Sequence, residues 1–282
     1  MTHIHDPRPC TLGEGALWHP EREELYWFDI LGKSLMTKGG TFQFDHHVSA
    51  AGWVDRDTLL IASEVELFTC NFASGECETI VPLEEENEGT RSNDGRADPW
   101  GGFWISTMGL NAEPDAGAIY RYYQGELRQL YAPLTIPNAI CFSSDRRFAY
   151  FTDTPTQIIL RVPLEEKDGW PADDPDIWLN LSEENWRPDG AVCDAEGNLW
   201  NAQWGGFRVA CYAPDGSFQR AVTFPSSQTT CPAFGGPDLT TLFCTSATDG
   251  LSETHRAQHP FSGQTFFAPD TAPGQKEHQV EL

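Results

Sequence analysis

Basic residues are scarce in this sequence. It holds 18 Lys and Arg residues against 42 Asp and Glu residues, which gives a formal net charge of −24 at pH 7. A charge of this sign repels phosphate backbones and anionic lipids, so we expect neither a nucleic-acid partner nor a membrane partner. The same charge attracts cations and disfavours self-association, which predicts a monomer or a weak homo-oligomer.

Several short motifs and long runs are also absent. None of the eight cysteines forms a C-x-x-C pair, which argues against a thiolate zinc site or a redox dithiol. There is no run of 18 apolar residues, and residues 1–15 are too polar for a secretion signal. We therefore expect a cytoplasmic protein in which all the cysteines are free and mostly buried.

One pattern recurs six times along the chain. A Gly- or Pro-led segment is followed by a polar turn and then by a strongly apolar strand, with strand centres roughly 35 to 50 residues apart. The six instances span residues 14–30, 52–64, 93–109, 137–154, 188–206 and 232–247, and their strand centres are Tyr26, Leu60, Trp104, Tyr150, Trp200 and Phe243. Such repeats, with little helical periodicity between them, predict an all-β protein, a six-bladed β-propeller forming a single domain over residues 1–282.

Turn residues and the chain ends complete this expectation. Polar turn sequences fall where hairpins must reverse, at residues 55–57, 144–146, 194–197 and 236–238. Residues 264–267 form the one strand candidate near the end, and it could complete the last blade. We expect a loose tail after Pro269 and a frayed N-terminus around His3 and His5.

Polar residues stand at the start of four repeats, namely Glu14, Asn93, Asn138 and Asp189. Equivalent positions of different blades converge on the central channel of a propeller, where two carboxylates and two amides would form a site for a hard cation. Taken singly, each of these residues is an ordinary turn residue. The prediction of a cation site therefore depends on their matching positions in the repeats.

Five segments carry a further indication: LGEGALWHP, RSNDGRADPWGGFWISTMG, IPNAICFSSDRRFAYFTDT, PDGAVCDAEGNLWNAQWGG and CPAFGGPDLTTLFCTSA. In this order they resemble the senescence-marker-protein/regucalcin/gluconolactonase family, blade by blade over nearly the whole chain. The resemblance implies a six-bladed propeller with one metal ion in its channel. It also implies an enzyme that hydrolyses sugar (aldono-) lactones to aldonic acids.

The resemblance assigns roles to six residues. It implies that Glu14, Asn138 and Asp189 are metal ligands, and that Arg91, Asn93 and Glu113 contact the substrate. Asp189 is also the candidate general base, although a metal ligand could instead only orient the attacking water. The ion is divalent; Ca²⁺, Mg²⁺ and Mn²⁺ suit oxygen ligands, and Zn²⁺ and Fe²⁺ also accept mixed oxygen sites.

Alternatives remain open at this point. Arg91 could instead form a surface ion pair with the acidic cluster at residues 84–88. Asn201 and Trp204 could line the pocket or only pack the fold. The whole protein could be a calcium-binding regulatory propeller without catalysis, a related propeller esterase, or a protein-interaction propeller. The pair Arg91 and Asn93 favours an enzyme, because a pure ion buffer has no use for them.

Overall fold

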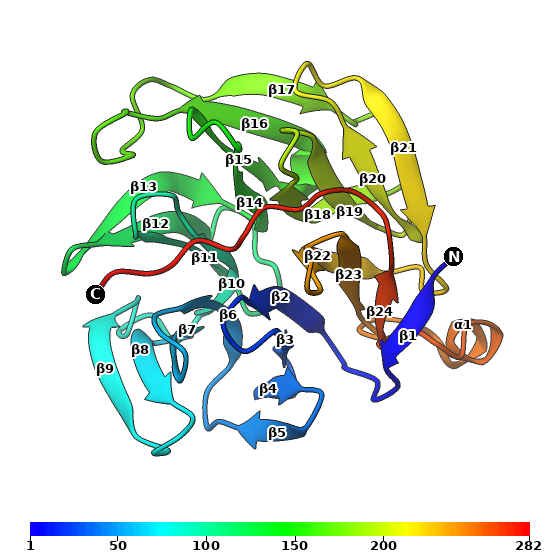
Figure 1. The fold of residues 1–282 in the computed structure, drawn as a ribbon, viewed down its shortest axis with the longest axis horizontal. Helices are drawn as coiled ribbons and strands as arrows, with labels where there is room; N and C mark the ends of the chain where they lie inside the picture. The colour runs from blue at the N-terminus through cyan, green and yellow to red at the C-terminus, as the bar shows by residue number, and fades with distance from the viewer.

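The computed structural model describes residues 1–282 and confirms the six-bladed propeller. Six antiparallel sheets of four strands each surround a central channel (Figure 1). We number the blades from the first complete sheet, so that blade 1 holds β2 to β5 and blade 6 includes both chain ends. No helix of this structure has the length and apolar character needed to cross a membrane.

The first three blades take up the first half of the chain. Blade 1 contains β2 (Gly13–His19), β3 (Glu24–Asp29), β4 (Ser34–Thr37) and β5 (Gly40–Gln43). Blade 2 contains β6 (Val48–Trp53), β7 (Thr58–Ser63), β8 (Glu66–Asn71) and β9 (Cys77–Pro82). Blade 3 contains β10 (Thr90–Ala97), β11 (Phe103–Gly109), β12 (Gly117–Tyr123) and β13 (Glu126–Leu134).

The other three blades contain the only helical segments. Blade 4 contains β14 (Pro137–Phe142), β15 (Phe148–Asp153), the 3₁₀ turn η1 (Thr154–Thr156), β16 (Ile158–Pro163) and β17 (Asp176–Asn180). Blade 5 contains β18 (Arg187–Cys193), β19 (Leu199–Trp204), β20 (Arg208–Tyr212) and β21 (Phe218–Thr223). Blade 6 contains β22 (Thr229–Gly235), β23 (Thr241–Ser246), the helix α1 (Glu253–Gln258), β24 (Thr265–Ala268) and β1 (His3–Asp6).

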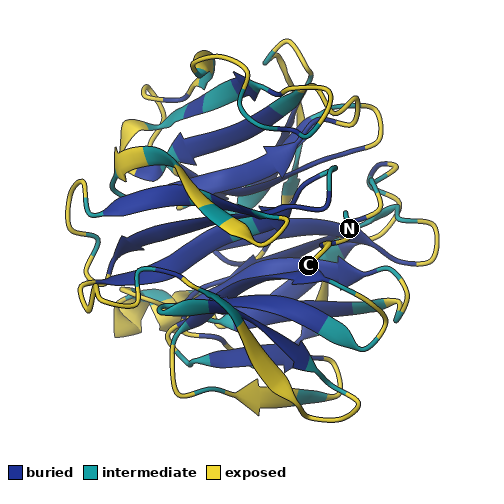
Figure 2. Cartoon of the chain, turned by 90° about the vertical axis from the view of Figure 1, so that its left-hand side faces the viewer, coloured by how far each residue is buried: buried dark blue, intermediate teal, exposed yellow.

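The second strand of each blade holds the core together. All six predicted strand centres lie in these second strands. Trp27, Trp104 and Trp200 occupy this layer in alternate blades and are fully buried. Burial decreases toward the outermost strands, which carry much of the exposed surface (Figure 2). Because both faces of every sheet pack on a neighbour, each second strand is buried over nearly its whole length.

The N-terminus closes the ring, contrary to the expectation that it is frayed. Strand β1 pairs antiparallel with β24, with His3 opposite Phe267 and Ile4 opposite Phe266. The ring of His5 packs edge-on against Phe243, with 5.1 Å between the centroids. The candidate strand at 264–267 is confirmed as β24, but its outer edge needed a partner. A strand from the other end of the chain satisfies those backbone groups.

The C-terminal residues do not form a loose tail. Residues 270–282, which we call the strap, run across one face of the ring (red in Figure 1). The strap's backbone bonds to blades 6, 2 and 3: Gly274 N donates to Leu239 O (2.9 Å), Val280 N to Trp53 O (2.9 Å) and Glu281 N to Gly101 O (2.8 Å). The tail has few apolar residues, but its backbone groups find partners on several blades.

A buried ion pair holds the middle of the strap. Glu277 pairs with Arg96 of β10, and both side chains are almost inaccessible to solvent. Trp53 Nε1 donates to the carbonyl oxygen of Glu277 at 3.0 Å. Arg96 lies near the end of β10 and Arg91 near its start, so the strap lies across the channel end away from the starts of the inner strands.

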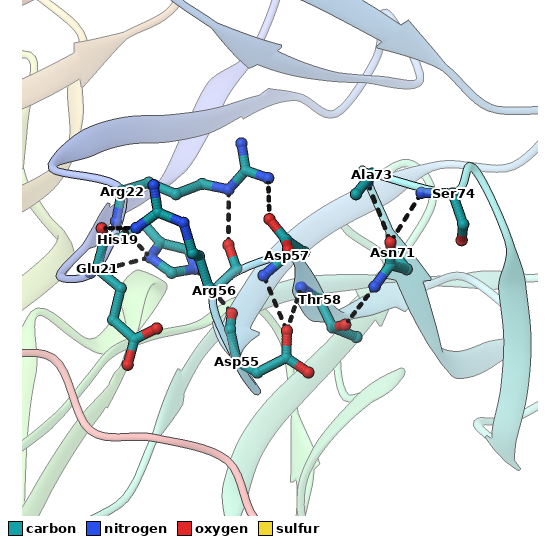
Figure 3. Close-up of polar contacts among 10 residues, drawn as sticks. All are labelled: His19, Glu21, Arg22, Asp55, Arg56, Asp57, Thr58, Asn71, Ala73 and Ser74. Carbon is teal, nitrogen blue, oxygen red and sulfur yellow. Dashed lines mark hydrogen bonds and ion pairs between the residues drawn. The ribbon is translucent and has the colours of Figure 1, made fainter.

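The predicted hairpin turns are all confirmed, and one of them joins two blades. The turn at residues 55–57 after β6 contacts the corresponding turn of blade 1 (Figure 3). Arg22 donates to Asp57 Oδ1 and to Arg56 O, both at 2.6 Å, and Arg56 donates back to Glu21 O at 2.7 Å. These partly exposed contacts fix the spacing of neighbouring blades at the rim.

The prediction that every cysteine is free is wrong for one pair. Cys70 and Cys77 form a disulfide between β8 and β9, where they face each other across the hairpin. The other six cysteines are free and buried, as expected. The separation of seven residues is unlike C-x-x-C, so only the strand register shows that the two thiols meet.

Candidate metal and substrate site

The starts of four inner strands line one cavity of about 280 Å³. Five of the six predicted site residues line it: Glu14, Arg91, Asn93, Asn138 and Asp189. They come from four different strands, β2, β10, β14 and β18. The structure therefore brings together side chains that are up to 175 positions apart in the sequence.

A register shift in each inner strand turns these side chains toward the channel. The shifts lie between Glu14 and Leu17 in β2, between Asn138 and Cys141 in β14, and between Pro188 and Ala191 in β18. Such a bulge sets two residues against one and re-aims a side chain. The bulges place one residue in a left-handed backbone conformation, with φ of 56° at Gly15 and 59° at Ala139.

Gly15 shows how tightly this arrangement is packed. A Cβ atom added at this position would lie 2.2 Å from the carbonyl oxygen of Ser49 on the neighbouring inner strand. Both the positive φ and the close approach of β6 therefore require glycine after Glu14. In the E-G pair of the first repeat, the backbone requires Gly15, and Glu14 is the candidate metal ligand.

Two carboxylates lie buried in this cavity without a positive partner. Glu14 and Asp189 are 7% and 5% exposed, and neither forms an ion pair. Burial, and next the charge of Asp189, raise the pKa of Glu14 well above its usual range. Burial, and next the charge of Asp94, do the same to the pKa of Asp189. A cation between them would offset both effects.

The donor set fits a hard divalent ion. No group of three or more His, Cys, Asp or Glu side chains is arranged to hold a metal, so a site here needs an amide oxygen as well. Asn138 supplies one, because it lines the same cavity and is 4% exposed. Two carboxylates and one amide oxygen suit such an ion and leave further positions for water or substrate.

Arg91 and Asn93 form a hydrogen-bonded pair beside the candidate ligands. Arg91 Nη1 donates to Asn93 Oδ1 at 3.0 Å, and Asn93 Nδ2 donates to Asn138 Oδ1 at 3.0 Å. Burial lowers the pKa of Arg91 to about 10, against an opposing effect of Glu14. Arg91 therefore remains a cation at neutral pH, and it lines the cavity.

Arg91 does not form the alternative ion pair with residues 84–88. Its side chain is 5% exposed and forms no salt bridge. Glu84, the cluster member nearest the core, instead accepts hydrogen bonds from Thr107 Oγ1 at 2.8 Å and Tyr120 OH at 2.7 Å. The start of the acidic cluster anchors its own loop to blade 3.

Glu113 lies outside the cavity in this structure. Its carboxylate accepts hydrogen bonds from the backbone N and the side-chain Nδ2 of Asn111, both at 2.9 Å. These bonds lower the pKa of Glu113, which is exposed to solvent. Its neighbour Ala112 does line the cavity. A substrate contact for Glu113 therefore requires a movement of this loop and remains a prediction.

Several residues of the site were not found from the sequence. Asp94 is fully buried next to Asn93, accepts a hydrogen bond from Ile140 N at 2.8 Å, and has a pKa that burial raises to about 6. Thr154, Arg187 and Asp249 line the cavity. Arg187 lies directly before the PDG motif, and Thr154 ends the FTDT motif, so each was close to a quoted segment.

The structure also separates the roles of Asn201 and Trp204. Trp204 lines the cavity. Asn201 is fully buried in β19, and its Nδ2 donates to the carbonyl oxygen of Asp189 at 2.8 Å. Asn201 thus supports the backbone of a candidate ligand without lining the cavity.

Comparison with known proteins places this geometry in a family. The family described as "SMP-30/Gluconolactonase/LRE-like region" matches residues 12–248. A putative sugar lactone lactonase of Rhizobium meliloti (strain 1021) is 40% identical, over 90% of this chain and 88% of its own length. An L-arabinolactonase of Azospirillum brasilense is 35% identical, over 92% and 88%.

A solved structure agrees with the sequence comparison. The calcium-binding protein regucalcin of Agrobacterium tumefaciens strain C58 is 37% identical and superposes with a TM-score of 0.98, covering 100% of this chain and 98% of the other. The chain belongs to the SMP-30/gluconolactonase/LRE-like family.

Proposed function

We propose that this protein hydrolyses sugar lactones with the help of one divalent metal ion held by Glu14, Asn138 and Asp189. Its family and the names of its relatives support the general assignment as a sugar lactonase. The observation that supports a bound metal ion is the presence of two buried carboxylates without ion pairs beside an amide oxygen. The cavity of about 280 Å³ is a size that suits a single small sugar.

Lactone hydrolysis needs three things from the site. Water must attack the carbonyl carbon, the developing oxyanion must be stabilised, and the ring oxygen must receive a proton as its bond to that carbon breaks. A divalent ion, when bound, would polarise the carbonyl and make water more acidic. The side chains of the cavity must supply the proton transfer and the orientation.

Asp189 is the proposed proton carrier. It is buried in the cavity and forms no ion pair, so it can take the proton of the attacking water and return it to the ring oxygen. Arg91 places a buried positive charge near the developing oxyanion. Asn93 is held between Arg91 and Asn138 and orients the sugar hydroxyls.

The substrate is expected to be a small aldonolactone. Relatives are named for L-arabinolactone and for 6-deoxy-6-sulfogluconolactone, the second from Pseudomonas putida at 32% identity over 95% of this chain. Both five-carbon and six-carbon lactones would fit a cavity of this volume. The overall acidity of the chain argues against strongly anionic substrates.

A panel of substrates tests this function. Turnover is followed with a pH indicator on pentonolactones, hexonolactones and aromatic esters, because each hydrolysis releases one proton. We expect turnover of at least one sugar lactone and little turnover of the esters. Aromatic-ester turnover without lactone turnover would instead favour a propeller esterase.

A calcium-binding protein without catalysis is the second candidate. The solved relative that carries that description superposes over the whole chain. A pure ion site has no need for the buried Arg91 and Asn93 beside it. Metal binding without turnover of any lactone in the panel would favour this candidate.

A further inference from the structure

The Asn138 amide lies within a line of hydrogen bonds that connects three blades. Asn93 of blade 3 donates to Asn138 Oδ1 at 3.0 Å, and Asn138 Nδ2 donates to Thr154 Oγ1 at 3.0 Å. Thr154 in turn donates to Pro188 O of blade 5 at 2.9 Å. A single line of side chains thus joins the three inner strands that carry Asn93, Asn138 and Asp189.

The direction of every bond in this line follows from its two ends. Pro188 O can only accept, so it takes the single proton of the Thr154 hydroxyl. The hydroxyl oxygen must therefore accept from Asn138. At the other end the guanidinium of Arg91 can only donate, which fixes Asn93 Oδ1 as an acceptor.

Asn93 and Thr154 leave Asn138 only one orientation. If its amide turned over, Oδ1 would face a hydroxyl whose proton is already used, and its NH₂ group would face the NH₂ group of Asn93. Both contacts would then be lost in a buried site. In the observed orientation Asn138 Oδ1 keeps a lone pair for a cation after accepting from Asn93.

The position of Thr154 is itself fixed by its surroundings. Its backbone N donates to Ile136 O at 3.0 Å, and the preceding Asp153 accepts from Ile136 N at 2.8 Å and Thr135 N at 3.1 Å. Thr154 is 8% exposed and begins η1, directly before a proline. The hydroxyl therefore has little freedom to leave the line.

We infer that the Thr154 hydroxyl is a positioning group that orients Asn138 as a metal ligand and ties it to the strand carrying Asp189. This inference rests on the proposed function, because it takes Asn138 to bind the ion. The effect of Thr154 on the ion passes through Asn138 and through Pro188, the residue before Asp189.

Metal affinity is the direct test. Chelator-treated protein is titrated calorimetrically with Ca²⁺ and, separately, with Mn²⁺, for the wild type, Thr154→Val, Thr154→Ser and Thr156→Val. Valine keeps the shape of threonine without the hydroxyl, and serine restores the hydroxyl. Thr156 lies in the same turn but is exposed, and its hydroxyl bonds to Asp153 O and Ile158 N, so its variant is the matched control.

We expect Thr154→Val to bind the preferred ion about 10- to 100-fold more weakly than the wild type, the usual effect of removing a hydrogen bond behind a ligand. Thr154→Ser and Thr156→Val should bind within about threefold of the wild type. Thermal unfolding of each metal-free variant shows whether it is folded, and Thr154→Ala replaces the valine variant if that one is not.

Different results would overturn different parts of the account. If the wild type binds metal but Thr154→Val binds equally well, the positioning role is wrong and the proposed function stands. Equal weakening by Thr154→Ser would also contradict it, because the hydroxyl would not be the group that matters. A wild type that binds neither ion and hydrolyses no lactone would overturn the proposed function, and the inference with it.

Discussion

At the candidate site, the chemistry of single residues is decided by burial. Glu14, Asp94 and Asp189 are three acids in a space that water hardly reaches, and burial is the largest influence on the pKa of each. A protein normally neutralises such groups with ion pairs. Here Arg91 donates hydrogen bonds to Ser92 O and Asn93, and the buried Arg96 near Asp94 forms its ion pair with Glu277. The proposed metal ion would compensate the charges of Glu14 and Asp189.

Substitution of Asp189 separates its two proposed roles. Asp189→Asn keeps an oxygen ligand but removes the group that takes the proton, so kcat should fall by about 100-fold or more while some metal affinity remains. Asp189→Ala should lose both. Turnover and metal titration are measured on each folded variant. Near-native turnover of Asp189→Asn would rule out Asp189 as the base.

The raised pKa of Asp94 predicts that the stability of the metal-free protein depends on pH. Its pKa is about 6 in the folded state against 3.8 for the ordinary group, so its ionised form is disfavoured by folding. The resulting penalty is complete above pH ~6, shrinks as the pH falls from ~6 to ~4, and vanishes below that. It amounts to roughly 3 kcal/mol.

The variant Asp94→Asn isolates this effect. It keeps an oxygen to accept from Ile140 N but carries no charge, and the loss of that charge also relieves Glu14 and Asp189 in the same direction. The free energy of unfolding of the variant relative to the wild type should therefore rise by roughly 3 kcal/mol between pH ~4 and pH ~7. A difference that stays constant with pH would contradict it.

On the scale of strands and segments, the two ends of the inner strands have different roles. The bulges at Glu14, Asn138 and Asp189 aim side chains into the channel. The strap crosses the opposite end, and its Glu277 meets Arg96 only five residues along β10 from Arg91. The inner strands thus carry the cavity at one end and are covered at the other.

The contribution of the strap to stability can be tested by changing its ion pair with Arg96. Glu277→Gln leaves Arg96 buried without a counter-charge, so the free energy of unfolding should fall by about 3–5 kcal/mol. The double variant Arg96→Met with Glu277→Met should recover most of this loss, because no unpaired charge remains. Denaturant unfolding measures all three proteins. A loss below about 1 kcal/mol for Glu277→Gln would mean that water reaches the pair.

On the scale of the whole molecule, the ring depends on both chain ends meeting in blade 6. Strand β1 supplies the outer strand of that sheet, beside β24. The ring is therefore closed by strand pairing between the two ends of the chain, with His3 opposite Phe267 and Asp6 opposite Thr265. Removing β1 exposes a strand edge and the aromatic surface of Phe243 and Phe267.

Deletion of residues 1–6 tests this closure. The midpoint of thermal unfolding should fall by roughly 5 °C, which corresponds to a loss of about 3 kcal/mol in a protein of this size. Deletion of residues 1 and 2 alone, which lie before β1, is the control and should have little effect. An unchanged midpoint after the longer deletion would show that the ring does not need this strand.

The sequence predicted the parts of this molecule that repeat. Apolar second strands such as the one around Trp104 stand out because each blade buries both faces, and Glu14, Asn138 and Asp189 share one place in the repeat. Features that occur only once were not predicted correctly, namely the pairing of β1, the strap and the Cys70–Cys77 disulfide. They depend on contacts that no periodic pattern records.

Lactone turnover before and after removal of the metal tests the central claim most directly. Protein treated with a strong chelator should lose nearly all turnover of its preferred sugar lactone, and one equivalent of a divalent ion per chain should restore it. The same treatment of Asp189→Ala should leave nothing to restore. Turnover that is indifferent to chelation, in protein shown to be free of metal, would contradict the account.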